Sequence, residues 1–189
     1  MQDNFELAKS QPFGARIFQI AYVVPSLEAA IPHYASCLSA GPWVVLDHFR
    51  PLSQKYRGQP TDLDLSLALA YSDSIMVELI QQHDGLPSVY RDVVDSRGYG
   101  FHHFAVSTLD YEEDWAKYSG LGYEAAFEAV VPETLDRARV TYFDARADLP
   151  GMIELVEFNE KVDAFFGSLR VAAANWDGQN LIHVLPTRV

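Results

Sequence analysis

Alternating apolar and polar positions predict several β-strands along the chain. The clearest is residues 62–71, where leucine takes four alternate positions, so that one face of the strand is apolar. The polar residues 72–74 then predict a turn into a second strand over residues 76–80. Two helices are predicted to begin after Ser26 and after Asp110, because each of these residues can cap the first turn of a helix.

The pattern of strands and helices occurs twice. Residues 18–23 resemble residues 102–106, since both are apolar segments in which a polar side chain stands at the same place. Each copy ends in a similar strand, at 76–80 in the first and at 152–156 in the second. The sequence therefore predicts two modules, each made of a strand, a helix and three further strands, and a fold of the α+β class.

The repeat divides the chain into four segments. We expect a first βαβββ module over residues 14–84, a linker over 85–98, a second βαβββ module over 99–158 and a C-terminal extension over 159–189. The linker is polar and is interrupted by glycine and proline. The extension contains a short amphipathic stretch and has no counterpart in the repeat. Its sequence does not indicate a role.

Four polar side chains stand in the middle of apolar strand faces, on the first and the last strand of each module. They are Gln19, Glu78, His103 and Glu154. Burial of one unpaired carboxylate costs several kcal/mol, and no lysine lies near these strands, so a divalent cation is the partner that would satisfy all four. Taken singly, a strand glutamate usually faces solvent, and a core histidine is usually hydrogen-bonded. The matching positions in both copies favour a metal site.

Five short segments carry a resemblance to a known family: Gln19-Ile-Ala-Tyr-Val-Val, Gly41-Pro-Trp, Val77-Glu-Leu-Ile-Gln, Gly100-Phe-His-His-Phe-Ala-Val and Met152-Ile-Glu-Leu-Val-Glu. Through these segments, which span about residues 16–158, the sequence resembles the vicinal oxygen chelate superfamily. Its members include glyoxalase I, methylmalonyl-CoA epimerase, extradiol dioxygenases and bleomycin-resistance proteins. The Gly-Phe-His-His segment is most similar to the glyoxalase I and epimerase branch.

The resemblance implies that the two modules form a curled mixed sheet around a metal-containing cavity. It implies that Gln19, Glu78, His103 and Glu154 are the metal ligands, a set similar to that of glyoxalase I. Three oxygens and one nitrogen suit a six-coordinate Mn, Co, Ni, Zn, Fe or Mg ion with positions open to a substrate. His103 is the favoured histidine, because it aligns with Gln19 in the repeat, and His102 is the alternative if a bulge shifts the strand.

The activity that this resemblance implies is that of a metal-dependent isomerase, epimerase or lyase that moves a proton next to a carbonyl. Glu154 is expected to be the catalytic base as well as a ligand, with Glu78 as the second candidate. Gln19 stands where extradiol dioxygenases and methylmalonyl-CoA epimerases have histidine, which disfavours Fe(II) oxygen chemistry and weakens the acyl-CoA hypothesis. Trp43 is expected near the mouth of the cavity, in contact with the substrate.

The alternative function is that of a metal-free protein that binds or sequesters a small molecule, like the bleomycin-resistance proteins. A net charge of −12 agrees with this alternative, because an acidic protein attracts cationic ligands. The four ligand-type residues on apolar faces favour the enzyme.

The composition of the chain indicates which binding partners and which cell compartment to expect. With 14 basic and 26 acidic residues, the chain is not expected to bind nucleic acid. No apolar run approaches the ~18 residues of a membrane-spanning helix, and residues 1–11 lack the pattern of a signal peptide. The single cysteine, Cys37, fits a reducing compartment. We therefore expect a cytoplasmic protein without a membrane partner, whose ligand is a small anionic or aromatic molecule, and the resemblance implies a homodimer.

Overall fold

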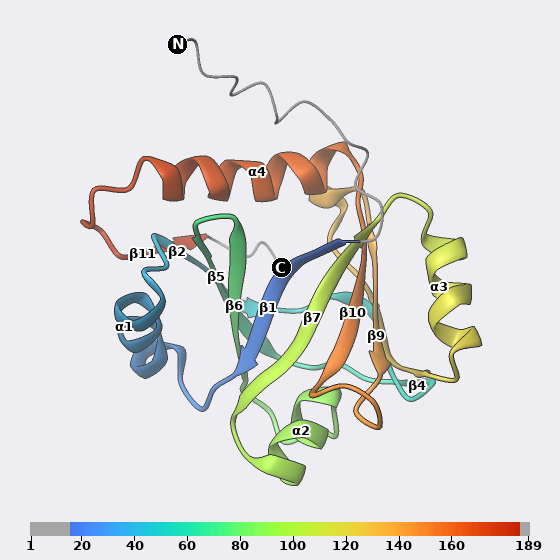
Figure 1. Ribbon diagram of the computed structural model, residues 1–189. Helices are drawn as coiled ribbons and strands as arrows, with labels where there is room; N and C mark the ends of the chain where they lie inside the picture. The colour runs from blue at the N-terminus through green and yellow to red at the C-terminus, as the bar shows by residue number, and fades with distance from the viewer. Residues whose placement is uncertain (1–15, 186–189) are drawn as a thin grey trace.

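A curled sheet of eleven strands and four α-helices form the part of the chain that the computed structural model describes, residues 16–185 (Figure 1). The strands are β1 (Arg16–Val23), β2 (Trp43–Phe49), β3 (Leu52–Tyr56), β4 (Gln59–Pro60), β5 (Leu65–Ser72), β6 (Ile75–Gln82), β7 (Gly100–Thr108), β8 (Glu124–Val130), β9 (Arg139–Asp144), β10 (Met152–Glu157) and β11 (Ile182–Leu185). The helices are α1 (Leu27–Leu38), α2 (Val89–Arg97), α3 (Tyr111–Gly120) and α4 (Glu160–Ala174), with a short 3-10 helix at Glu133–Leu135.

The two halves of the chain arrange their strands in the same order. Outward from the centre of the sheet, the first half runs β1-β6-β5-β2 and the second runs β7-β10-β9-β8. The halves join within one chain through the antiparallel pair β1–β7, whereas β1–β6 and β7–β10 are parallel pairs. The expected α+β class and mixed sheet are therefore confirmed. The sheet stays open, with β11 and β4 as its edges.

The hairpin and the two helix starts that the sequence predicts are present in the structure. β5 and β6 make the expected antiparallel hairpin, and the alternating leucines lie on β5 and just before it. Ser26 Oγ accepts a hydrogen bond from the Ala29 N–H at the start of α1, and Asp110 accepts one from the Glu113 N–H at the start of α3. Each cap satisfies a backbone donor that a helix terminus leaves without a partner.

The segment expected to be a linker contains a helix, α2. Ser88 Oγ caps this helix by accepting a hydrogen bond from the Arg91 N–H, and Val89, Tyr90 and Val93 form its buried face. With so short an apolar face among polar residues, α2 resembles a loop in sequence, and it is stabilised by the sheet on which it packs.

The C-terminal extension is also part of the fold. α4 begins at the cap Asn159, and β11 pairs in parallel with β2 at the edge of the sheet. Residues 1–15 and 186–189 lie outside the described part of the chain. They include residues 1–11, considered for a signal peptide, and the outer ends of the predicted first module and C-terminal extension.

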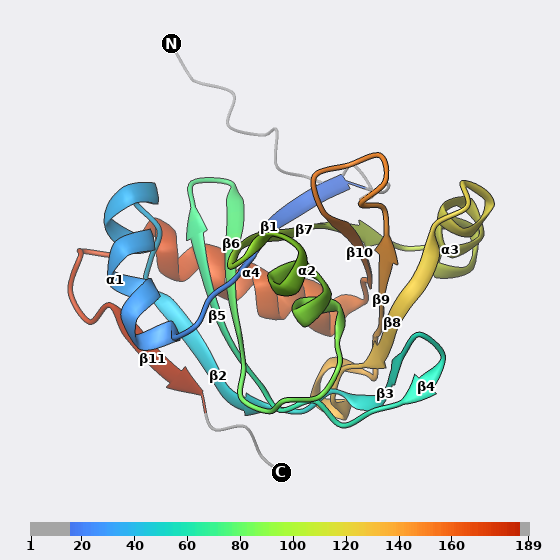
Figure 2. The same cartoon turned by 90° about the horizontal axis from the view of Figure 1, so that it is seen from below.

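Helices cover the sheet on both faces. α1 and α3 pack on its outer face, where Ile31 and Tyr111 lie in the core. α2 lies inside the curl at one end, with the strands around it, and α4 crosses the opposite end (Figures 1 and 2). Between residues 16 and 185, no helix is both long and apolar enough to cross a membrane.

Candidate metal centre

The four predicted ligands lie on four neighbouring strands at the centre of the sheet. Glu78 is on β6, Gln19 on β1, His103 on β7 and Glu154 on β10, and these strands are adjacent in that order. All four side chains are buried, since each residue is at most 7% exposed. These residues are 25–135 positions apart in sequence, and only the assembled sheet brings them together, so the site depends on the tertiary fold.

Strand register places the four side chains on the inner face of the curl. They form two rows across the strands, with Glu78, Ala21 and His103 in one row and Gln19, Ala105 and Glu154 in the other. Residues that face each other on paired strands share one face of the sheet. Because Ala21 and Ala105 are small, the space above the β1–β7 pair is left to the polar groups.

Three of the groups converge on one point. His103 Nε2 lies 3.1 Å from Glu154 Oε2 and 3.6 Å from Glu78 Oε2. One ligand atom from each of these residues fits within 4.8 Å of the others. Among the described residues, neither His103 Nε2 nor Glu78 Oε2 has a hydrogen-bond partner. The Gln19 amide lies beside them in register, and its N–H contacts Met76 Sδ at 3.5 Å.

The electrostatics of this group favour a bound cation. Burial raises the pKa of Glu78 well above its usual value, and the neighbouring Glu154 raises it further. Two carboxylates in a buried space cannot both stay ionised without a positive partner. The unpaired nitrogen and oxygen, together with the mixed donor set, therefore fit a divalent metal ion.

His102 lies beside the group but points differently from His103. Its Nδ1 is 2.8 Å from His103 Nδ1, and its Nε2 is 3.1 Å from the carbonyl oxygen of Val89. Burial, and then His103, lower the pKa of His102 well below its usual value, so its ring is neutral. The structure thus places His103, and not His102, next to Glu78 and Glu154.

Two tyrosines line the same space. Tyr142 of β9 lies opposite Glu154 in register, and its ring centroid is 4.9 Å from that of His103. The Tyr90 hydroxyl of α2 approaches the Tyr142 hydroxyl at 3.5 Å. Burial raises the pKa of both phenols, and Glu78 and Glu154 raise it as well, so both stay neutral. The sequence did not single out this pair, because only the packing of α2 into the curl brings Tyr90 there.

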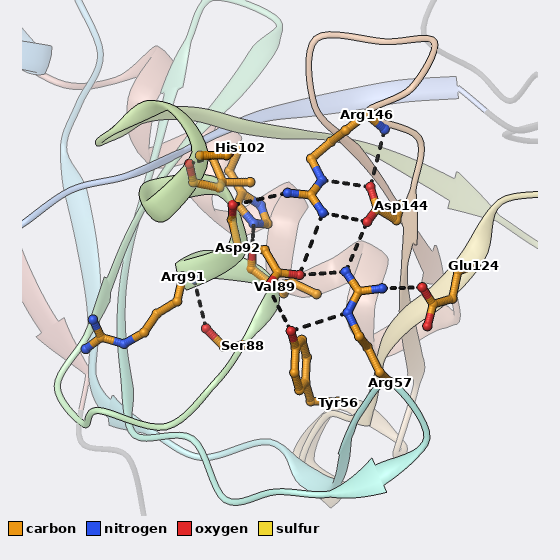
Figure 3. A network of polar contacts seen from close by, with 12 residues as sticks. Tyr56, Arg57, Ser88, Val89, Arg91, Asp92, His102, Glu124, Asp144 and Arg146 are labelled. Atoms are coloured by element: carbon orange, nitrogen blue, oxygen red, sulfur yellow. Dashed lines mark hydrogen bonds and ion pairs between the residues drawn. The ribbon is translucent and has the colours of Figure 1, made fainter.

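A charged network holds α2 over the site (Figure 3). Arg57, in the turn between β3 and β4, binds Asp92 of α2 at 2.7 Å and Asp144 of β9 at 3.1 Å. Arg146 donates to Asp144 at 2.6 Å and to the carbonyl oxygen of Asp92 at 3.1 Å. These hydrogen bonds, first from Arg146 and then from Arg57, lower the pKa of Asp144 to about 2. The network links both halves of the sheet to α2.

Trp43 is not part of the site. It is fully buried in the core between α1 and the outer face of the sheet, together with Val45 and Leu79. Leu79 follows Glu78 on β6, and consecutive strand residues point to opposite faces. The structure therefore places Trp43 on the far side of the sheet from the four polar side chains, and the expected place of Trp43 beside them is corrected on this ground.

A second group of metal-type side chains lies on the surface, at Asp47, His48 and His83. The sequence did not predict that these histidines come together. His48 Nδ1 is 2.9 Å from Asp64, His83 Nε2 is 2.7 Å from Ser66 Oγ, and the two rings stack with centroids 4.5 Å apart. One nitrogen of His48 and both nitrogens of His83 already have hydrogen-bond partners, and all three residues are exposed. The buried group is therefore the stronger candidate.

Comparison with known proteins identifies the family. The family model described as the Glyoxalase/Bleomycin resistance protein/Dioxygenase superfamily matches residues 18–142. A solved structure of a hypothetical protein from Bacillus halodurans C-125 is 18% identical, with a TM-score of 0.53 over 78% of this chain and 96% of that chain. The methylmalonyl-CoA epimerase from Mycobacterium tuberculosis is 21% identical, with a TM-score of 0.51 over 84% and 96% of the two chains. At these identities the likeness shows the fold.

No curated protein matches this sequence. The family model nevertheless covers more than half of the chain, and it includes the strands that carry Gln19, Glu78 and His103. The chain therefore belongs to the glyoxalase/bleomycin resistance protein/dioxygenase superfamily.

Proposed function

We propose that this protein is a metal-dependent enzyme that moves a proton at a carbon next to a carbonyl group, as an isomerase, epimerase or lyase. The observation that carries the proposal is the buried group of Glu78, His103 and Glu154, in which two ligand atoms have no hydrogen-bond partner among the described residues. Such a group costs folding free energy. Its presence in a family that includes enzymes supports a functional role.

In this proposal the four inner-face residues hold one divalent ion, and the carboxylates also move protons. The bound ion supplies a Lewis acid, which polarises a carbonyl and makes the neighbouring C–H more acidic. Glu154 accepts the proton, and Glu78 stands across the β1–β7 pair as the second base. The neutral phenols of Tyr142 and Tyr90 can donate hydrogen bonds to negative charge that develops on a substrate oxygen.

The site is closed to solvent in this conformation, since its residues are almost fully buried. α2 covers one side through Tyr90, and α4 covers the other through Leu169 and its neighbours. We propose that substrate enters when one of these helices moves, because the sheet itself is held by continuous strand pairing.

Metal content is the first test. Protein purified without chelator or nickel resin should contain about one divalent ion per chain, and a His103→Ala, Glu154→Ala double variant should contain none. The second candidate function, metal-free sequestration of a cationic or aromatic molecule, is supported by the net charge of −12. Failure of the wild type to bind added Mn, Co, Ni or Zn would favour it. Homodimerisation and a cytoplasmic location stay predictions.

Proton transfer is the second test. A solved structure of similar fold is a methylmalonyl-CoA epimerase, so that acyl-CoA is the first substrate to assay, followed by α-hydroxy carbonyl adducts. In deuterated water, the wild type should exchange the substrate's α-proton, and Glu154→Gln should lower the rate by about 100-fold or more. Exchange at the wild-type rate in that variant would refute the role of Glu154.

A further inference from the structure

We propose that His102 is a positioning residue that sets the tautomer of His103 and thereby aims the His103 Nε2 lone pair at the metal position. The inference concerns the protonation and orientation of His103 before a metal binds, and its functional meaning rests on the proposed metal site. It is carried by a chain of hydrogen bonds that runs from the backbone of α2 at Val89 to His102 (Figure 3) and from His102 to His103.

A β-bulge brings the two histidines onto the same side of the sheet. On β7, His103 pairs with Ala21 and Phe101 pairs with Tyr22, so His102 is the extra residue between two successive pairs. Adjacent residues of a regular strand would point to opposite faces, and a bulge removes this restriction. The His102 ring is fully buried and packs beside Tyr90, with ring centroids 5.0 Å apart.

The hydrogen-bond partners determine where the protons lie. The carbonyl oxygen of Val89 can only accept a hydrogen bond, so His102 Nε2, 3.1 Å away, must carry a proton. A neutral imidazole has one N–H, and His102 Nδ1 is therefore an acceptor. His103 Nδ1, 2.8 Å from it, must then be the donor. In neutral His103 this leaves the lone pair on Nε2.

That lone pair points into the proposed metal site. His103 Nε2 lies 3.1 Å from Glu154 Oε2 and 3.6 Å from Glu78 Oε2, and it has no hydrogen-bond partner in the described part of the chain. With the opposite tautomer, an N–H would point at the metal position, and the ring would have to lose that proton before it could bind. A hydrogen-bonded partner at the other nitrogen typically fixes the tautomer of a ligating histidine.

The chain of hydrogen bonds begins at a well-anchored group. Val89 is the first residue of α2, which is capped by Ser88 and held through Asp92 by Arg57. The position of the helix between the modules is therefore coupled, through His102, to the orientation of a ligand in the centre of the sheet. His102 itself is not available as a ligand, because both of its nitrogens are engaged.

The tautomers can be measured without metal or substrate. Two-bond 1H–15N correlation spectra of the metal-free wild type at pH about 8 should show His102 as the Nε2–H form and His103 as the Nδ1–H form. His103 in the Nε2–H form would overturn the inference. Because no metal is present, this result is independent of whether the proposed function is correct.

Two variants of His102 separate positioning from packing. In His102→Asn the amide oxygen can take the place of Nδ1 and accept from His103, whereas in His102→Gln the amide reaches the Val89 carbonyl but leaves His103 Nδ1 without its acceptor. We expect His102→Gln to weaken Co2+ binding by about 10–100-fold and to shift the His103 tautomer, while His102→Asn restores both. Wild-type binding and an unchanged tautomer in a folded His102→Gln would overturn the inference. If that variant does not fold, the wild-type spectrum decides.

Discussion

Gln19 and His103 occupy equivalent places on the two central strands, each one residue after a β-bulge and two residues before a buried alanine. Because β1 and β7 are antiparallel, Gln19 faces Ala105 and His103 faces Ala21. The two copies of one sequence motif thus each place a polar side chain opposite a small alanine of the other copy.

The residues in the two bulges are covered by different helices. The Phe18 ring lies 5.4 Å from Phe166 of α4, and the His102 ring lies 5.0 Å from Tyr90 of α2. The halves are therefore alike in backbone and different in environment. The Phe18 ring offers Gln19 no conventional hydrogen bond, whereas His102 is hydrogen-bonded to His103.

Ala105→Leu tests whether the space above the central strands belongs to the site. A leucine there would occupy the space between Gln19 and Glu154, so we expect loss of Co2+ binding together with a destabilisation of about 1–3 kcal/mol. Ala68→Leu is the matched control, because Ala68 is as deeply buried but lies in the core beneath α1. Urea unfolding and metal titration measure both effects. Equal metal affinity in the two variants would contradict the prediction.

Glu78→Gln should stabilise the metal-free protein at neutral pH. The pKa of Glu78 is raised above its unfolded value of about 4.5, so the folded chain retains a proton that the unfolded chain has released, and stability falls as pH rises above that value. The neutral amide avoids this loss, and we expect a gain on the order of 1 kcal/mol in the presence of chelator.

The gain from Glu78→Gln should disappear as pH falls toward about 4.5, and it should reverse when metal is added, since the variant lacks a ligand. Urea titrations at several pH values, with and without added metal, measure it. A variant that is less stable than the wild type at every pH, even with chelator, would show that Glu78 contributes a stabilising contact.

Asp144→Asn tests the network that holds α2. The folded pKa of Asp144, about 2, lies below the unfolded value of about 3.8, so its charge stabilises the fold above pH 3.8, and this contribution is lost as pH falls toward 2. At pH 7 we expect a loss of ~1 kcal/mol, reduced by solvent screening at this partly exposed group, and little difference near pH 2.

The matched control for Asp144 is Asp136→Asn, which removes an exposed ion pair with Lys161. Exposed ion pairs contribute about 0.2–1 kcal/mol to stability, so we expect Asp136→Asn to lower the stability less than Asp144→Asn does. Thermal unfolding from pH 2 to 7 compares the two. Equal pH dependence in both variants would rule out a special role for the Asp144 network.

Tyr90→Ala should open the covered side of the site. Removal of a buried aromatic side chain costs about 3–5 kcal/mol and leaves a cavity above His102 and Tyr142. We expect a chelator to remove metal from this variant faster than from the wild type, as followed by stopped-flow absorption. Tyr90→Phe is the control, because it keeps the volume and loses only the 3.5 Å contact with Tyr142. Equal rates in the Ala and Phe variants would show that metal leaves by another route.

Much of the fold could be predicted from sequence, because its signals are local. The alternating leucines before and along β5 identify a strand, although both of its faces are buried in the structure, and Ser26 and Asp110 identify helix starts. The repeat placed Gln19, Glu78, His103 and Glu154 on matching strands, since a period of two specifies which side chains share a face.

Other features were decided only by the tertiary structure. The sequence by itself determined the module pattern and the candidate ligands, which depend on neighbours within a strand or helix. The position of α2 inside the curl, the approach of Tyr90 to Tyr142 and the burial of Trp43 beneath α1 depend on contacts between distant segments. The bulge at His102 depends on the pairing of β7 with β1. Long-range packing selects among the arrangements that local patterns allow, because burial of apolar surface does not depend on sequence separation.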